Sequence, residues 1–97
     1  MLFTIVCTDK PSRLDTRLAA RASHLSYLER YVDRLVHVGP LLDDDGRACG
    51  SLLIIDVEDR AAAEGFAASD PYAKVDLFES TVIRGFRTVF RDGAVVE

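Results

Sequence analysis

Residues 17–35 read RLAARASHLSYLERYVDRL and contain two different stripes at helical spacing. The first stripe is polar, because Arg17, Arg21 and His24 stand at i, i+4 and i+7, positions that share one side of an α-helix. The second stripe is apolar and is the expected buried face; it consists of Leu18, Ala22, Leu25, Leu28, Val32 and Leu35. At about 100° per residue the polar stripe lies roughly 60° from the centre of the apolar one, so it should border a groove at the edge of the core.

The segments around this helix predict strands. A short apolar, β-branched run precedes the helix, and three further apolar runs follow it. A second helix, with Asp59 as its N-cap, separates the last two runs. The expected strands are Leu2–Thr8, Val36–Leu42, Ser51–Val57 and Phe78–Phe90, and the expected second helix is Arg60–Ser69. This βαββαβ order predicts an α+β, ferredoxin-like fold, with a four-stranded antiparallel sheet and both helices on one face.

The third expected strand indicates a partner for the other face. Its residues Leu52–Ile55 are consecutively apolar, so both of its faces should be buried. Another copy of the same sheet is the simplest cover for the face without helices, which predicts a homodimer with two sheets packed face to face. The last strand should bend or bulge at Gly85, and the tail after it contains a short strand candidate at Ala94–Val96.

The composition limits the class of protein. The chain has 97 residues and is 48% hydrophobic, which predicts one small domain, residues 1–97, with a packed core. A net charge of -4 disfavours a general nucleic-acid binder and a protein of anionic membrane surfaces. The apolar run at the N-terminus stops at Asp9, too soon for a signal peptide or a membrane span, so the expected location is cytoplasmic. Cys7 and Cys49 fit neither a disulfide framework nor a zinc site and are expected to be reduced and buried.

The predicted topology brings polar residues from separate segments to one end of the sheet. The first half of the first helix, the later part of the second strand, the start of the third strand and the end of the second helix should all lie where the first strand finishes. These segments carry the polar stripe, the pair Gly39-Pro40, Ser51, and the sequence Asp70-Pro71-Tyr72. We therefore expect a shared cavity at this end.

Two residues there suit acid–base chemistry. His24 and Asp70 are candidates for an imidazole–carboxylate pair, in which the carboxylate fixes the tautomer and stabilises the imidazolium. His24 would then act as a general base or acid near neutral pH. The spacing shows no activated serine or cysteine nucleophile, and we expect neither a metal ion nor an organic cofactor.

The remaining candidates bind a small-molecule ligand. Arg17 and Arg21 can hold a substrate oxyanion, Ser51 lies at the same end, and Tyr72 can donate a hydrogen bond or stack on a ring. Structural interpretations stay open as well. The arginines can pair with Asp15 or other surface carboxylates, a histidine at a helix edge often makes only a structural hydrogen bond, and an Asp-Pro pair is commonly a stop signal for a helix.

Two functions remain open on these residues. The first is an enzyme that performs elimination, isomerisation or hydrolysis on a small polar or anionic organic molecule. The alternative is a non-catalytic accessory module that binds a small metabolite in the same pocket. A third interpretation is that the polar rim only stabilises the dimer.

The motifs also form an ordered set that covers nearly the whole chain. They are Arg17-x3-Arg21-x2-His24-Leu25, Gly39-Pro40-Leu41, Gly50-Ser51, the strand Leu52–Val57 and Asp70-Pro71-Tyr72. This set resembles the YciI-like family. The resemblance implies a ferredoxin-like dimeric α/β barrel, with an active site on a histidine and an aspartate that correspond to His24 and Asp70. Some relatives catalyse dehydrochlorination of a chlorinated hydroxyquinol. The chain departs from the family pattern at Ala22, where relatives often have proline, and at Phe86, where many have tryptophan.

Overall fold

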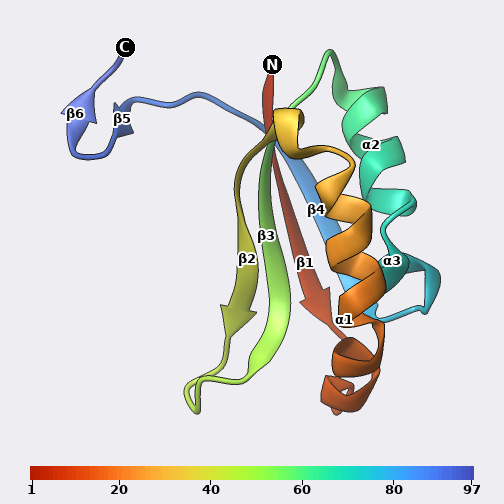
Figure 1. Ribbon diagram of the computed structural model, residues 1–97. Coiled ribbons are helices and arrows are strands. Elements are labelled where there is room, and N and C mark those ends of the chain that lie inside the picture. The colour runs from red at the N-terminus through yellow and green to blue at the C-terminus, as the bar shows by residue number, and fades with distance from the viewer.

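The computed structural model describes residues 1–97, which form a sheet with helices on one of its faces (Figure 1). The long elements are β1 (Leu2–Asp9), α1 (Leu14–Glu29), β2 (Leu35–Leu42), β3 (Ala48–Asp56), α2 (Arg60–Ala68) and β4 (Phe78–Phe86). The short elements are a 3₁₀ turn (Val32–Arg34), helix α3 (Pro71–Lys74) and strands β5 (Phe90–Arg91) and β6 (Ala94–Val95). None of the helices is long and apolar enough to cross a membrane.

The main sheet has the strand order that the sequence predicts. Its strands run in the order β2-β3-β1-β4, and each neighbouring pair is antiparallel. Because β1 and β3 are central, their helix-facing side chains are almost fully buried; these are Phe3, Ile5, Cys7, Leu53 and Ile55. The α+β, ferredoxin-like fold with a four-stranded antiparallel sheet is therefore confirmed.

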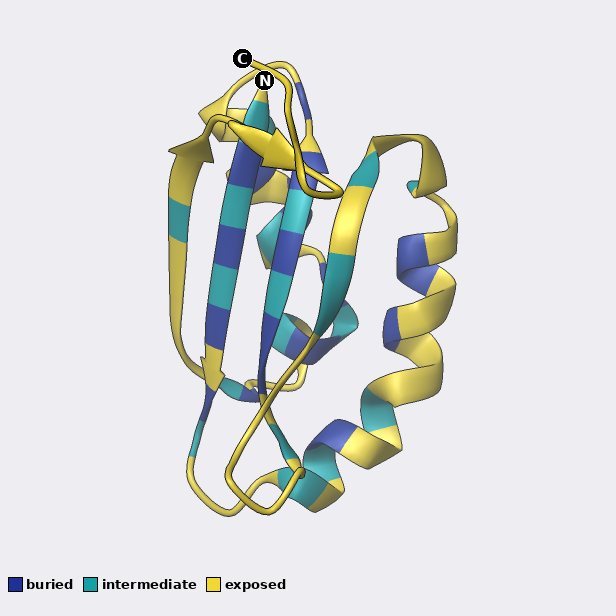
Figure 2. Cartoon of the chain, turned by 90° about the vertical axis from the view of Figure 1, so that its left-hand side faces the viewer, coloured by how far each residue is buried: buried dark blue, intermediate teal, exposed yellow.

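Helix α1 turns a different face to the sheet from the one that its apolar residues predict. Its buried side chains are Arg17, His24, Tyr27 and Leu28. By contrast, Leu18 is 59% exposed and Leu25 is 38% exposed, so of the apolar stripe predicted on this helix only Leu28 is buried, and the rest of that prediction is wrong. Figure 2 shows the buried positions along one side of the helix. The polar stripe goes inward because its buried members meet carboxylates there, and burial of a charged group is tolerated when it is paired.

Helix α1 also ends earlier than predicted, at Glu29 rather than near Leu35. The rings of Tyr31 and Phe66 of α2 form a T-shaped pair, with centroids 5.1 Å apart. The 3₁₀ turn after it then delivers Leu35 to the start of β2, where Leu35 pairs with Ile55. The helix therefore stops where the chain has to enter the sheet.

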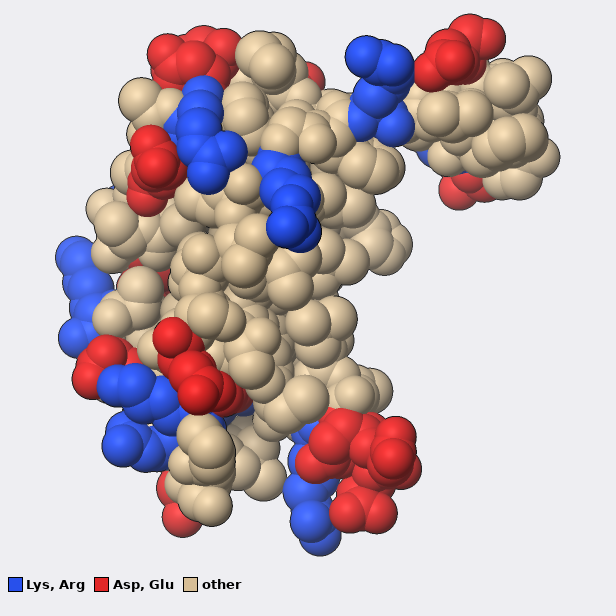
Figure 3. Space-filling model, turned by 180° about the vertical axis from the view of Figure 1, so that it is seen from behind, with Lys and Arg blue, Asp and Glu red and all other residues tan.

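Strand β4 ends at Phe86 rather than at Phe90, because its partner strand ends. Phe86 pairs with Leu2, the first residue of β1, so later residues have no strand beside them. They form instead a small hairpin of β5 and β6 around the turn Asp92-Gly93, where both φ angles are positive. This hairpin contains the strand expected in the tail and projects from the end of the sheet (Figures 1 and 3).

Two smaller predictions need correction. The register of β4 passes through Gly85 without a shift, and the irregularity lies instead at the other end of the pairing with β1, between Thr8 and Asp9. Cys7 is buried as expected, and burial raises the pKa of its thiol to about 11, so it remains a protonated packing group. Cys49 is exposed, because it stands where the register between β2 and β3 shifts near the end of the sheet.

Gly50 generates a testable prediction about the contact between β1 and β3. A Cβ atom at Gly50 would lie 2.4 Å from the carbonyl oxygen of Cys7, whereas one at Gly85 would have no heavy atom within 4 Å. We expect Gly50→Ala to lower the free energy of unfolding by about 2 kcal/mol, because backbone has to move. The matched control Gly85→Ala should leave this free energy unchanged or raise it by about 0.5 kcal/mol. Urea denaturation of both variants measures the difference, and equal losses would contradict the prediction.

Candidate active site

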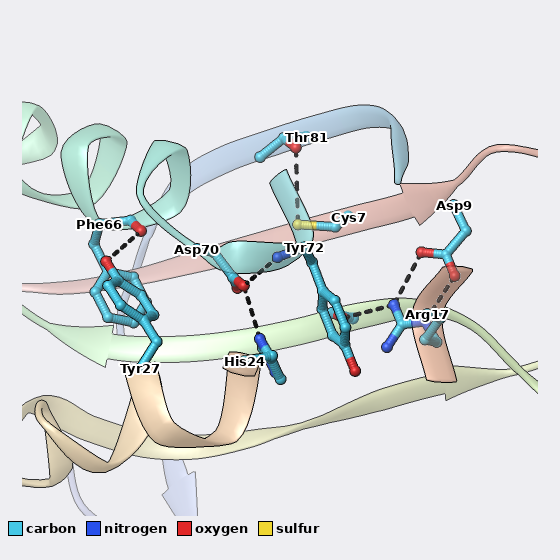
Figure 4. A network of polar contacts seen from close by, with 10 residues as sticks. Cys7, Asp9, Arg17, His24, Tyr27, Phe66, Asp70, Tyr72 and Thr81 are labelled. Atoms are coloured by element: carbon cyan, nitrogen blue, oxygen red, sulfur yellow. Dashed lines mark hydrogen bonds and ion pairs between the residues drawn. The ribbon is translucent and has the colours of Figure 1, made fainter. Parts of the chain in front are cut away.

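His24 and Asp70 form a buried hydrogen bond at the point where α1 meets α3 (Figure 4). The distance from His24 Nδ1 to Asp70 Oδ1 is 2.8 Å, and the two side chains are 9% and 4% exposed. The same Oδ1 accepts the backbone N–H of Tyr72 at 2.9 Å. A carboxylate only accepts hydrogen bonds, so Nδ1 donates in this pair, and in the neutral form of the ring Nε2 is then the nitrogen with the lone pair. The predicted imidazole–carboxylate contact is present, and its part in catalysis stays a prediction.

The Asp-Pro sequence explains why the carboxylate points to the helix α1. Asp70 is the N-cap of α3, with φ -62° and ψ 130°, and Pro71 is at the start of that helix. Proline favours such an extended residue before it and fits the first position of a helix. The pair therefore ends α2 and at once begins α3, so that the capping carboxylate has its remaining lone pairs free for His24.

The ring of Tyr72 lies between His24 and Arg17 (Figure 4). The imidazole stacks on it with ring centroids 4.0 Å apart and planes at 15°, and Arg17 Cζ lies 4.6 Å from the ring centroid. Tyr72 is 2% exposed. Burial raises the pKa of Tyr72, although the nearby charge and hydrogen bond of Arg17 act in the opposite direction. Its phenol is therefore protonated at neutral pH and can donate a hydrogen bond.

Arg17 is held by the carboxylate of Asp9, which the sequence pattern did not indicate as a site residue. Its Nε and Nη2 donate to the two oxygens of Asp9 at 2.7 and 2.9 Å, and Nη2 also donates to Ser51 Oγ at 2.9 Å. The alternative that Arg17 pairs with Asp15 or another surface carboxylate is therefore wrong, because its partner is buried. Burial opposes the charge of Arg17, but the hydrogen bond and charge of Asp9 outweigh it and raise the pKa of the guanidinium. The guanidinium thus stays charged inside the core.

A cavity of about 330 Å³ opens between α1 and the strands β2 and β3. Its polar wall contains Arg17, Arg21, His24, Ser51 and Tyr72. The rest of the lining is mostly apolar and consists of Leu18, Leu25, Leu28, Val38, Gly39, Pro40 and Ala48. Leu18 and Leu25, which are exposed on the outside of the core, therefore form part of the wall of this cavity. A mixed lining of this kind suits a small organic ligand with a few polar groups.

Arg21 differs from Arg17 in its charge balance. Arg21 is exposed and lines the same cavity, yet it takes part in none of the ion pairs of the structure. Its guanidinium is thus free to meet an anionic group of a ligand.

The topology brings together the six residues that the sequence singled out. Five of them line the cavity, and Asp70 lies behind His24. Their roles in catalysis and in ligand binding remain predictions. Asp9 is the residue that sequence reasoning missed, although a signal was present: at period two it shares the face of Phe3, Ile5 and Cys7. A carboxylate on that face needs a buried cation.

The structure brings no group of three or more His, Cys, Asp or Glu side chains together in a way that could hold a metal ion.

Comparisons with known proteins identify the family of this chain. The family model described as YCII-related domain matches residues 1–87. Protein YciI of Escherichia coli O6:H1 is 35% identical over 98 residues, which cover 93% of this chain and 100% of that protein.

Two solved structures are similar as well. The first is 5-chloro-2-hydroxyhydroquinone dehydrochlorinase (TftG) of Burkholderia phenoliruptrix AC1100 in complex with 2,5-dihydroxybenzoquinone. It is 34% identical with a TM-score of 0.84, and the match covers 90% of this chain and 94% of that one. The second, an antibiotic biosynthesis monooxygenase, is 17% identical with a TM-score of 0.55 over 92% of this chain and 99% of that one, so it shares the fold alone. By its sequence and its fold, the chain belongs to the YCII-related domain family.

Proposed function

We propose that this protein is an enzyme that uses His24 and Asp70 to eliminate a leaving group from a small, hydroxylated, anionic organic molecule. The observation that carries the proposal is a buried imidazole–carboxylate pair on the wall of a small cavity. Its geometry leaves Nε2 of His24 available to a ligand, while Asp70 holds the other nitrogen. Isomerisation also begins with removal of a proton from the substrate, and in hydrolysis the histidine would take the proton from a water molecule; these are the related reactions.

The elimination balances with the groups at hand. Nε2 of His24 takes a proton from the substrate, and the electron pair of the broken bond moves into a new π bond. The leaving group departs with the electrons of its own bond to carbon, so no external oxidant or reductant is needed. Asp70 stabilises the imidazolium that forms, because an adjacent carboxylate favours the charged state. Arg21 holds the anionic oxygen of the substrate, and the Tyr72 phenol is a second donor to it.

The solved relative supports this class of reaction. Its name states a dehydrochlorination, in which one proton and one chloride leave, and its ligand is a hydroxylated ring. A cavity of about 330 Å³ has room for one such ring. We infer that this chain accepts a substrate of the same kind, a chlorinated or otherwise activated hydroxylated ring.

The acid–base pair can be tested with 5-chloro-2-hydroxyhydroquinone as the probe and chloride release as the measurement. We expect His24→Gln and Asp70→Asn to lower kcat about a hundredfold or more, because positioned acid–base groups typically contribute that much. Arg21→Met should mainly raise KM. The matched control is Asp76→Asn, since Asp76 is exposed and outside the cavity.

The outcomes separate the two functions. Turnover that survives in His24→Gln would contradict the proposed role of the histidine. Binding of the probe without chloride release by the unaltered protein would favour the non-catalytic binding module instead.

We also propose that a second copy of the chain covers the face of the sheet that has no helix. Val82 and Phe86 of β4 are 39% and 43% exposed on this face, opposite the central strand. On the neighbouring β5–β6 hairpin, Phe90 and Val95 are 67% and 62% exposed. A two-stranded hairpin is marginal by itself in water, so these apolar side chains favour a partner. The sheets would then pack face to face in a homodimer.

Sedimentation equilibrium tests this homodimer. The unaltered chain should sediment with twice its monomer mass, and Val82→Lys should sediment as a folded monomer, because a lysine would be buried without a partner. Val75→Lys is the matched control, since Val75 is 46% exposed at the end of α3, in the helix layer. A monomeric unaltered chain at all concentrations would overturn the proposal.

A further inference from the structure

We propose that Asp9 positions the acid–base histidine, acting through Arg17 and Tyr72. The contacts run in one chain from the end of β1 to the start of α3. Asp9 holds Arg17, Arg17 covers one side of the Tyr72 ring, and His24 stacks on that ring (Figure 4). The catalytic part of this inference rests on the proposed function, whereas the positional part does not.

The first step is the geometry of the ion pair. Two nitrogens of Arg17 meet the two oxygens of Asp9, which fixes the plane of the guanidinium as well as its place. A third bond, from Nη2 to Ser51 Oγ, anchors the same group to β3. Arg17 and Asp9 have side chains only 5% and 6% exposed, so water does not compete with these bonds. The guanidinium is therefore a rigid surface inside the core.

The second step is the dependence of Tyr72 on that surface. Tyr72 belongs to α3, which has only four residues and is too short to hold a side chain by its own stability. Its ring is placed by neighbours instead. The His24 ring centroid lies 4.0 Å from that of Tyr72, Arg17 Cζ lies 4.6 Å from it, and Phe78 forms a T-shaped pair with it at 6.1 Å between centroids. Loss of the guanidinium would leave the ring without its contact on the side away from the imidazole.

The third step concerns His24. Its imidazole is held at one edge by the single hydrogen bond to Asp70 and on one face by the Tyr72 ring. The imidazole turns about its Cβ–Cγ bond; one hydrogen bond at Nδ1 limits this turn, and the stacked ring limits it further. The direction of Nε2 into the cavity thus depends on Tyr72, and through Tyr72 on Arg17 and Asp9.

The neutralised charge of Arg17 favours a role in positioning its neighbours over a role in binding the ligand. Asp9 neutralises Arg17 at contact distance, whereas Arg21 has no carboxylate partner. A substrate anion would therefore be attracted to Arg21, and Arg17 would serve as structure in the wall of the cavity.

Proton NMR of the histidine ring tests the positional part without a substrate. The chain has two histidines, and His37 lies outside the cavity and contacts neither Arg17 nor Tyr72, so it serves as an internal reference. Stacking on the tyrosine face should move the carbon-bound ring protons of His24 upfield of those of His37. In Asp9→Asn we expect the His24 resonances to move toward those of His37, while the His37 resonances stay in place.

Two further variants keep the test decisive. Arg17→Lys retains the positive charge beside Asp9 but removes the flat fork, so it should release the stacked ring in the same way even if Asp9→Asn fails to fold. Asp76→Asn makes the same chemical change at an exposed carboxylate that pairs with Lys10, and it should leave both histidines unchanged. Unshifted His24 resonances in a folded Asp9→Asn or Arg17→Lys protein would overturn the inference.

Kinetics then separate positioning from ligand binding. With the chlorinated hydroquinone as probe, Arg17→Lys should lower kcat about tenfold to a hundredfold through misplacement of His24, with little change in KM. A rise in KM with unchanged kcat would assign Arg17 to the substrate and contradict its positioning part. An unaltered protein without turnover would refute the proposed function alone, because the NMR result is independent of it.

Discussion

The need to pair every buried charge governs how this chain is assembled. Helix α1 brings an arginine and a histidine into the core, and each would be costly to bury without a partner. Asp9 at the end of β1 and Asp70 at the start of α3 provide the two partners, so α1 docks in one orientation. No buried side-chain nitrogen or oxygen is left without a hydrogen bond. The same docking places a cavity between α1 and the strands β2 and β3.

This constraint explains which features of the fold were readable from the sequence. The strand order follows from the order of apolar runs and turns in the sequence, and the predicted four-stranded antiparallel sheet is confirmed. The buried face of α1 was predicted wrongly, because the spacing of its apolar residues assigns Arg17 and His24 to the edge of the core rather than to its interior. Their burial depends on carboxylates that are 8 and 46 residues away in the chain, and local periodicity carries no information about such distant partners.

The ends of elements were also decided by neighbours. The pattern from Phe78 to Phe90 is suitable for a strand throughout, yet β4 stops where β1 stops, because a ladder needs two strands. Cys49 is exposed because the register between β2 and β3 shifts there, and no residue type in the sequence predicts that shift. For the site, the sequence predicted that six residues share one cavity. It did not identify Asp9 as a site residue, and it predicted the same role, binding of a substrate oxyanion, for Arg17 and Arg21. In the folded protein Arg17 is paired with Asp9, whereas Arg21 has no carboxylate partner, and this difference depends on the tertiary structure.

Buried ion pairs seldom add much net stability, since the cost of removing two charges from water nearly cancels their attraction. An apolar pair of similar volume at Asp9 and Arg17 would serve a simple core equally well. What the ion pair adds is direction, because two parallel hydrogen bonds fix the plane of the guanidinium where apolar contact would leave it loose. That plane sets the Tyr72 ring, and the ring in turn limits the rotation of His24. In this fold the buried charges therefore matter less for how firmly the chain folds than for where one nitrogen atom points.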